Sequence, residues 1–127
     1  MTSSPPRKPT DAELAILRVL WTRGPSTVRE VSTALGREGA YTTVLKLLQI
    51  MTDKRLVERD ESARTHVYRA AHPEEQMQRH LVADLLERAF DGSAAKLMMR
   101  ALSAKKASAK ELEEIRKLLK AKQEESK

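Results

Sequence analysis

The stretch from Ala40 to Arg59, AYTTVLKLLQIMTDKRLVER, constrains the fold of this chain more than any other feature of the sequence. Its apolar residues recur at i, i+3, i+4 and i+7, the spacing of one buried stripe on a helix. The three polar residues singled out on the opposite face include no carboxylate. The last residues, 56–59, alternate in the way a strand does. The stripe consists of Val44, Leu47, Leu48 and Met51, and the polar face of Thr42, Lys46 and Gln49.

Two shorter helices are predicted before this stretch. Thr10 and Glu13 have the spacing of a capping box, in which each side chain accepts a hydrogen bond from the backbone of the other residue. The helix that they open should end at Gly24-Pro25, because glycine can close a helix and proline cannot continue it. Ser26 or Thr27 then caps a second helix.

A helix-turn-helix followed by a β-hairpin is the arrangement that these elements predict. The turn at 36–39 contains two glycines and leads into the third helix, 41–55. Two strands, 56–59 and 65–70, are joined by a polar connection at 60–64. Three helices with such a hairpin form a winged helix, so the fold class should be mainly α.

The C-terminal part of the sequence predicts three further helices with wide apolar stripes, beginning at Pro73, Ala94 and Ser108. A segment of this size buries too little surface to form a globule alone. The same segment of a second chain is the most economical partner, and packing against the N-terminal module is the alternative. We expect dimerisation through Leu81, Leu85, Leu86, Phe90, Leu97, Leu112, Ile115 and Leu119.

The sequence therefore predicts four segments. They are a disordered arm at 1–9, a winged helix-turn-helix domain that binds DNA at 10–72, a helical dimerisation domain at 73–122 and a charged tail at 123–127. No run of residues resembles a signal peptide or a membrane span, so we expect a cytoplasmic protein that joins the nucleoid when it is bound to DNA.

Composition excludes several classes of site. The chain has 127 residues and a net charge of +6, which suits a small domain with an acidic partner such as nucleic acid. It has no cysteine, so a disulfide, a thiolate metal site and a cysteine nucleophile are excluded. The sequence shows no catalytic triad, phosphate-binding glycine loop or zinc-protease motif, and its histidines, His66, His72 and His80, are scattered. We expect no enzyme, cofactor or metal.

Lys46 and Gln49 are the candidate readers of DNA sequence, because their side chains are long enough to reach base edges in the major groove. Lysine matches the acceptors O6 and N7 of guanine, and glutamine matches the edge of adenine. Near the start of the same helix, Tyr41, Thr42 and Thr43 could donate to phosphates, although Tyr41 could equally pack under its own module. Arg64, on the hairpin, would meet the adjacent backbone or the minor groove.

Several motifs between Thr10 and Leu119 resemble those of one family, the penicillinase repressors of the BlaI, MecI and CopY type, which are bacterial winged-helix transcriptional regulators. The resemblance lies in TDAELAILRVLW from Thr10, STVREV from Ser26, AYTTVLKLL from Ala40, MTDKRLVER from Met51, the hairpin ending at Tyr68, and FDGS from Phe90.

This resemblance implies a homodimeric repressor. The N-terminal winged helices of the family read inverted repeats, and the C-terminal helices form the dimer. By position, Tyr41, Thr42, Thr43 and Lys46 fall on the recognition helix and Arg64 on the wing. We expect a sequence-specific repressor on a palindromic operator in double-stranded DNA. The alternative is a winged-helix module that binds proteins, without specific DNA binding.

Two regulatory modes of the family differ in this sequence. Members that sense copper use a cysteine-rich C-terminal site, which a chain without cysteine cannot form. Members that respond to β-lactams are inactivated by proteolysis at an Asn-Phe bond, and the corresponding position here is Arg100-Ala101. The signal that releases this repressor is therefore unidentified; a regulatory protease that cleaves in the C-terminal domain is one form that it could take.

Overall fold

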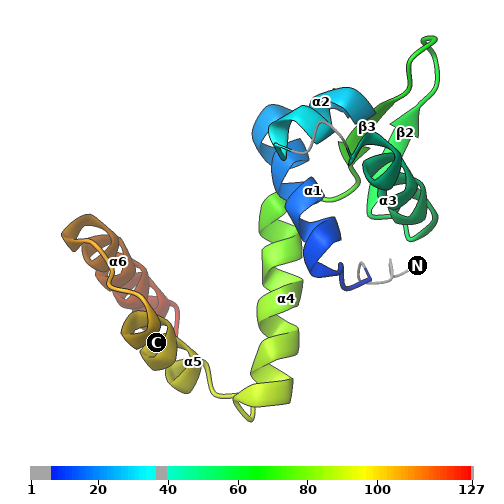
Figure 1. Cartoon of the computed structure of the whole chain (residues 1–127). Coiled ribbons are helices and arrows are strands. Elements are labelled where there is room, and N and C mark those ends of the chain that lie inside the picture. The colour runs from blue at the N-terminus through cyan, green and yellow to red at the C-terminus, as the bar shows by residue number, and fades with distance from the viewer. Residues whose placement is uncertain (1–6, 37–39, 127) are drawn as a thin grey trace. The chain divides into compact units, whose positions relative to one another are not determined.

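The computed structural model describes residues 7–36 and 40–126 (Figure 1). Most of the predicted N-terminal arm, three positions of the predicted turn at 36–39 and the last residue of the predicted tail lie outside the described residues. Within the described end of the arm, Pro9 is buried, and the Lys8 ammonium lies 3.6 Å from the Asp84 carboxylate. The chain divides into two compact units, Met1–Asp84 and Leu85–Lys127.

The first unit is a winged helix-turn-helix, so the predicted mainly helical fold class is confirmed (Figure 1). Its three N-terminal helices are α1 (Asp11–Arg23), α2 (Val28–Ala34) and α3 (Tyr41–Asp53). A small antiparallel sheet accompanies them, formed by β1 (Ser26–Thr27), β2 (Val57–Asp60) and β3 (Val67–Ala70) in the order β1-β3-β2. β2 and β3 form the hairpin, and β1 pairs with the other edge of β3.

Three details of this unit differ from the sequence-based expectation. β1 is absent from the predicted elements, because two residues are too few to show an alternating pattern. The strands of the hairpin occupy 57–60 and 67–70 instead of 56–59 and 65–70, which leaves a longer connection between them. α3 ends at Asp53, two residues before the predicted end at Arg55, because Arg55 adopts the left-handed conformation with φ 63°.

The core of the first unit is aliphatic apart from one tyrosine, and its residues come from α1, α2, α3, the hairpin and the start of α4. From α3 it takes Val44, Leu48 and Met51, each at most 2% exposed, which fixes the direction of the opposite face of that helix. Leu47 is half-buried and packs against this core. The other buried residues are Ile16, Leu17, Leu20, Val28, Val31, Leu56, Val57, Tyr68 and Met77.

Capping boxes begin three of the helices. Thr10 and Glu13 exchange both hydrogen bonds at the start of α1, and Thr27, one of the two predicted caps, does the same with Glu30 at the start of α2. These hydrogen bonds from Thr27 hold the pKa of Glu30 below its ordinary value. Ser108 forms the third predicted box at the start of α6. The threonine and serine signals in the sequence therefore locate these helix starts correctly.

The remaining helices are α4 (Glu74–Ala89), α5 (Ala94–Ala104) and α6 (Ala109–Glu125). Met77 joins the core of the first unit, and the Trp21 indole nitrogen donates to the carbonyl oxygen of His72 at 2.9 Å just before α4. α6 continues to Glu125, so residues 123–125 of the predicted charged tail are helical, and Lys122 forms an ion pair with Glu125. No residue of 85–126 is buried.

Candidate nucleic-acid interface

The outer face of α3 carries every residue that the sequence predicts to contact DNA from this helix. Its exposed predicted residues are Tyr41, Thr42, Thr43, Lys46 and Gln49. The first turn of α3 contains no acidic residue. Within residues 7–36 and 40–126, no ion-pair partner is found for Lys46, so its ammonium group is available to an external acceptor.

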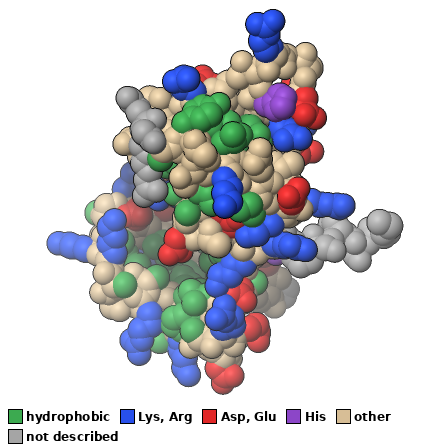
Figure 2. Space-filling model, turned by 45° about the vertical axis from the view of Figure 1, so that its right-hand side comes forward, with side chains coloured by type: hydrophobic (Ala, Val, Ile, Leu, Met, Phe, Trp, Pro, Cys, Tyr) green, Lys and Arg blue, Asp and Glu red, His purple; other side chains and the backbone are tan. Residues whose placement is uncertain are grey.

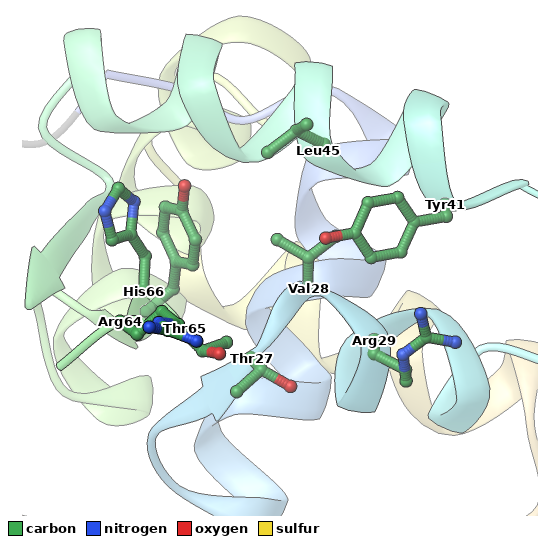
Figure 3. Close-up of a pocket in the computed structure, with 9 residues that line it drawn as sticks. Thr27, Val28, Arg29, Tyr41, Leu45, Arg64, Thr65 and His66 are labelled. Atoms are coloured by element: carbon green, nitrogen blue, oxygen red, sulfur yellow. The ribbon is translucent and has the colours of Figure 1, made fainter. Parts of the chain in front are cut away.

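Arg64, the predicted residue of the wing, is exposed in the connection between β2 and β3. It faces a hollow of about 540 Å³ that separates the hairpin from α2 and α3 (Figure 3). Tyr41 lines the same hollow, whereas Thr42, Thr43, Lys46 and Gln49 do not. The predicted residues therefore divide between the outer face of α3 and this hollow beside it.

Several residues of the hollow are not among the predicted contacts, and Arg29 is the most prominent of them. In Figure 3, Arg29 of α2 lies beside Tyr41 of α3, with Thr65 and His66 of the hairpin on the other side. The Arg29 guanidinium carbon lies 5.6 Å from the centre of the Tyr41 ring, a cation–π contact. The alternation of buried and exposed residues along α2 could have indicated that Arg29 is exposed. Its contact with Tyr41, twelve positions later, depends on how α2 and α3 pack against each other.

Acidic side chains of the wing are already engaged. The Glu61 carboxylate lies 3.4 Å from the Arg59 guanidinium and 3.7 Å from the His66 imidazole. Asp60 accepts a hydrogen bond from the Ser62 amide at 2.9 Å, and this bond helps to hold the pKa of Asp60 below its ordinary value. Arg64 has no ion-pair partner in the part of the chain that the structure describes, so the wing presents one uncompensated cation.

Lys54 is engaged inside the first unit instead of facing outward. Its ammonium group lies 2.9 and 3.0 Å from the two carboxylate oxygens of Glu13, which is 2% exposed. Burial raises the pKa of Glu13, but the hydrogen bonds with Thr10 and Lys54 and the positive charge of Lys54 together lower it further. The pKa of Glu13 therefore lies below its ordinary value, and the carboxylate stays charged at neutral pH.

The residues predicted for dimerisation lie on α4, α5 and α6, except Phe90, which follows directly after the end of α4. Leu81 packs against the core of the first unit. The others are exposed (Leu85, Leu112 and Leu119) or half-buried (Leu86, Phe90, Leu97 and Ile115), and further exposed apolar residues outside the predicted set are Val82, Met99, Leu102 and Leu118. Figure 2 shows hydrophobic side chains reaching the surface between lysine and arginine side chains.

Neither a metal centre nor a membrane span is found among the residues that the structure describes. No group of three or more histidine, aspartate or glutamate residues could hold a metal ion there. None of the described helices is both long and apolar enough to cross a bilayer.

Comparisons of the sequence with known proteins point to one family of regulators. The model of the family described as penicillinase repressor matches residues 9–121. The transcriptional regulator BlaI of Mycobacterium tuberculosis, in two strains, is 38% identical over 87 residues. That alignment covers 66% of this chain and 63% of the relative, so the match spans less than two thirds of the relative's length.

Solved structures support the fold alone, because their sequences are distant. A MarR family protein from Bacillus stearothermophilus aligns with a TM-score of 0.51 at 24% identity, over 95% of this chain and 78% of that chain. The complex structure of hsRosR-S4 aligns with a TM-score of 0.50 at 20% identity, over 97% of this chain and 96% of that chain.

Proposed function

Because this chain belongs to the penicillinase repressor family, we propose that it is a transcriptional repressor that binds an inverted-repeat operator as a homodimer. The outer face of α3 is the observation that carries the proposal. One face of this helix is buried in the core, and the other exposes three hydroxyl groups, an amide and a lysine with no ion-pair partner among the described residues. Ile50 and Asp53 are also exposed, toward the end of the helix. An α-helix of this kind fits the major groove of B-form DNA.

In this proposal the residues of α3 have two roles. Lys46 and Gln49 read base edges, because they lie beyond the first turn and have the longest exposed polar side chains of the helix. Lys46 donates to guanine, and Gln49 exchanges hydrogen bonds with adenine. Tyr41, Thr42 and Thr43, in the first turn, lie beside the phosphates, and Arg64 approaches the next stretch of backbone or the minor groove.

The homodimer is proposed from the apolar side chains of α4, α5 and α6. Within residues 85–126 no side chain is buried. Three large apolar side chains there are about half exposed: Leu85 at 45%, Leu112 at 48% and Leu119 at 47%. Covering such side chains with those of a second copy removes apolar area from water, which is the main driving force for association. The predicted half-buried residues Leu86, Phe90, Leu97 and Ile115 belong to the same proposed interface.

Dimerisation gives the repressor its affinity for an operator. One winged helix makes few base contacts, whereas a linked pair binds the second half-site as an intramolecular step at high effective concentration. A signal that separates the two copies would therefore release the operator. Proteolysis is one form of this signal, and the exposed residues Arg100 and Ala101 on α5 occupy the position of the cleaved bond in the family's β-lactam-responsive members.

Selection from a pool of random duplexes tests the proposal and identifies the operator in the same experiment. The protein is bound to the pool, the retained duplexes are amplified and sequenced, and the enriched duplex is compared with its scrambled version in a mobility-shift assay. We expect a single enriched inverted repeat that binds at least tenfold more tightly than the scrambled duplex. Equal binding to the two duplexes would contradict a sequence-specific repressor and would favour a module that binds proteins.

A further inference from the structure

The hollow between α2, α3 and the hairpin has a lining suited to an anion. It takes Thr27 and Arg29 from the start of α2, Tyr41 from α3, and Arg64, Thr65 and His66 from the hairpin, and its described lining residues include no carboxylate (Figure 3). We propose that it seats one sugar-phosphate strand of the DNA, with Arg29 as a phosphate-binding residue and Tyr41 as its positioning residue. This inference rests on the proposed function, because it assumes that α3 lies in the adjacent major groove.

The two walls of the hollow supply donors from opposite sides. Arg29 and Arg64 carry the permanent positive charges, and the hydroxyl groups of Thr27 and Thr65 can each donate a hydrogen bond. The volume, about 540 Å³, lies within the range of roughly 300–1,000 Å³ typical of ligand sites. A strand that enters between the walls can therefore meet cations on both sides.

Neighbouring acidic groups do not neutralise Arg29. Glu30, the next residue, caps Thr27 and lies 3.4 Å from the Arg23 guanidinium. Glu61, on the hairpin side, is engaged by Arg59 and His66. Among the described residues no ion-pair partner is found for Arg29, so its charge is available to a phosphate.

Tyr41 prepares Arg29 for this contact. A free arginine side chain loses rotamer entropy when a ligand fixes it, and this loss weakens binding. Here the guanidinium lies over the Tyr41 ring at 5.6 Å, so part of that freedom is already lost in the unbound protein. Tyr41 is 41% exposed and stays on the surface, where its ring supports the arginine.

The test measures binding to a mixed-sequence 30-base-pair duplex over a series of salt concentrations, since phosphate contacts do not depend on sequence. In Arg29→Ala we expect the slope of log affinity against log salt to fall by about 0.9, the value for one lost phosphate contact. Affinity should fall by the same factor for the selected and the scrambled duplex, which leaves the preference between them intact. The control Arg18→Ala removes an exposed charge from α1, outside this hollow, and should leave the slope unchanged.

Variants of Tyr41 test the positioning role, with thermal unfolding of each variant as the check on folding. Tyr41→Phe keeps the ring and should retain the wild-type affinity, whereas Tyr41→Leu should bind both duplexes more weakly and keep the wild-type slope, because Arg29 still contacts the phosphate but loses more rotamer entropy. An Arg29→Ala slope equal to that of the wild type would overturn the phosphate site, even if the operator preference persists. Equal losses in Tyr41→Phe and Tyr41→Leu would overturn the positioning role. If the wild type binds the selected and the scrambled duplex equally well, the proposed function itself is wrong.

Discussion

The ion pair between Lys54 and Glu13 joins the end of α3, the proposed recognition helix, to the start of α1. These residues lie just after the end of α3 and in the first turn of α1, 41 positions apart in the sequence. The sequence indicates a helix-capping role for Glu13, which the structure confirms, and suggests for Lys54 only the general attraction of a cation to a helix C-terminus. Their contact could not be predicted, because it depends on how the two helices pack.

Replacing Glu13 by glutamine should destabilise the first unit by about 1–3 kcal/mol, because the Lys54 ammonium loses a charged hydrogen-bond partner in a mostly buried place. Glutamine can still complete the capping box, so the change isolates the ion pair. Chemical denaturation measures the effect. Glu30→Gln, at the exposed capping box of α2, is the matched control and should change the free energy of unfolding less.

Lowering the pH should remove the stabilisation by the Glu13–Lys54 ion pair in the wild type. The pKa of Glu13 is lower in the folded protein than in the unfolded chain, so its stabilisation is fully present above the unfolded pKa of about 4.3 and is lost as the pH falls through the folded value. We expect the unfolding free energies of the wild type and Glu13→Gln to converge as the pH is lowered below about 4. A constant difference from pH 7 to pH 3 would contradict the assigned charge of Glu13.

Lys46→Ala should reduce binding to the selected operator by about 1–3 kcal/mol if Lys46 reads a base, and it should relax the preference at one base position. Binding to the scrambled duplex should change much less. Titrations of both duplexes measure the difference. Lys96→Ala, which removes an exposed lysine from α5, is the control. An equal loss on both duplexes would show that Lys46 meets phosphate and does not read sequence.

At the scale of the elements, the sequence predicts what depends on local signals. Capping boxes and the 3.6-residue period locate α1, α2 and α6 because both patterns act within a few residues. Local signals could not predict β1, because Ser26 and Thr27 form a strand only by pairing with Tyr68 and Val67 of β3. The hollow beside α3 could not be predicted either, because its walls come from α2, α3 and the hairpin, which are separate in the sequence.

The end of α3 offers a test of backbone conformation. Arg55 has φ 63°, which is unfavourable for a residue with a β-carbon. Arg55→Gly should therefore raise the free energy of unfolding by roughly 0.5–1 kcal/mol. Gly24→Ala, at φ 91°, is the reciprocal variant and should lower it. Denaturant titration of the two variants compares them, and a destabilised Arg55→Gly protein would contradict the left-handed conformation.

In the whole molecule, the two units differ in how much of their apolar surface is buried. Among the described residues, the core cluster of the first unit has twelve buried apolar residues, whereas no residue is buried in 85–126. The sequence predicts this contrast through the wide stripes of α5 and α6. That a second copy covers them stays a prediction, because an apolar stripe shows the same pattern whatever its partner is.

Leu85→Glu or Leu112→Glu should prevent self-association. Each variant should leave the first unit folded, because both side chains are about half exposed in a single chain. A charge placed in the centre of an apolar interface loses its hydration without gaining a partner. Sedimentation velocity at micromolar concentration should show a dimer for the wild type and a monomer for each variant. Ile50→Glu, at an exposed apolar position of α3, should remain dimeric. A monomeric wild type would contradict the proposed dimer.

The dependence of affinity on half-site spacing is the sharpest test of whether a homodimer places two linked copies of α3 on one duplex. Duplexes carry the selected half-sites at their natural spacing, with 5 added base pairs, or with 10. Five base pairs turn one half-site to the opposite face of the helix, because B-form DNA has about 10–10.5 base pairs per turn. We predict that affinity falls with 5 added base pairs toward that of a single half-site and partly recovers with 10. The same affinity at every spacing, or for a single half-site, would contradict the account.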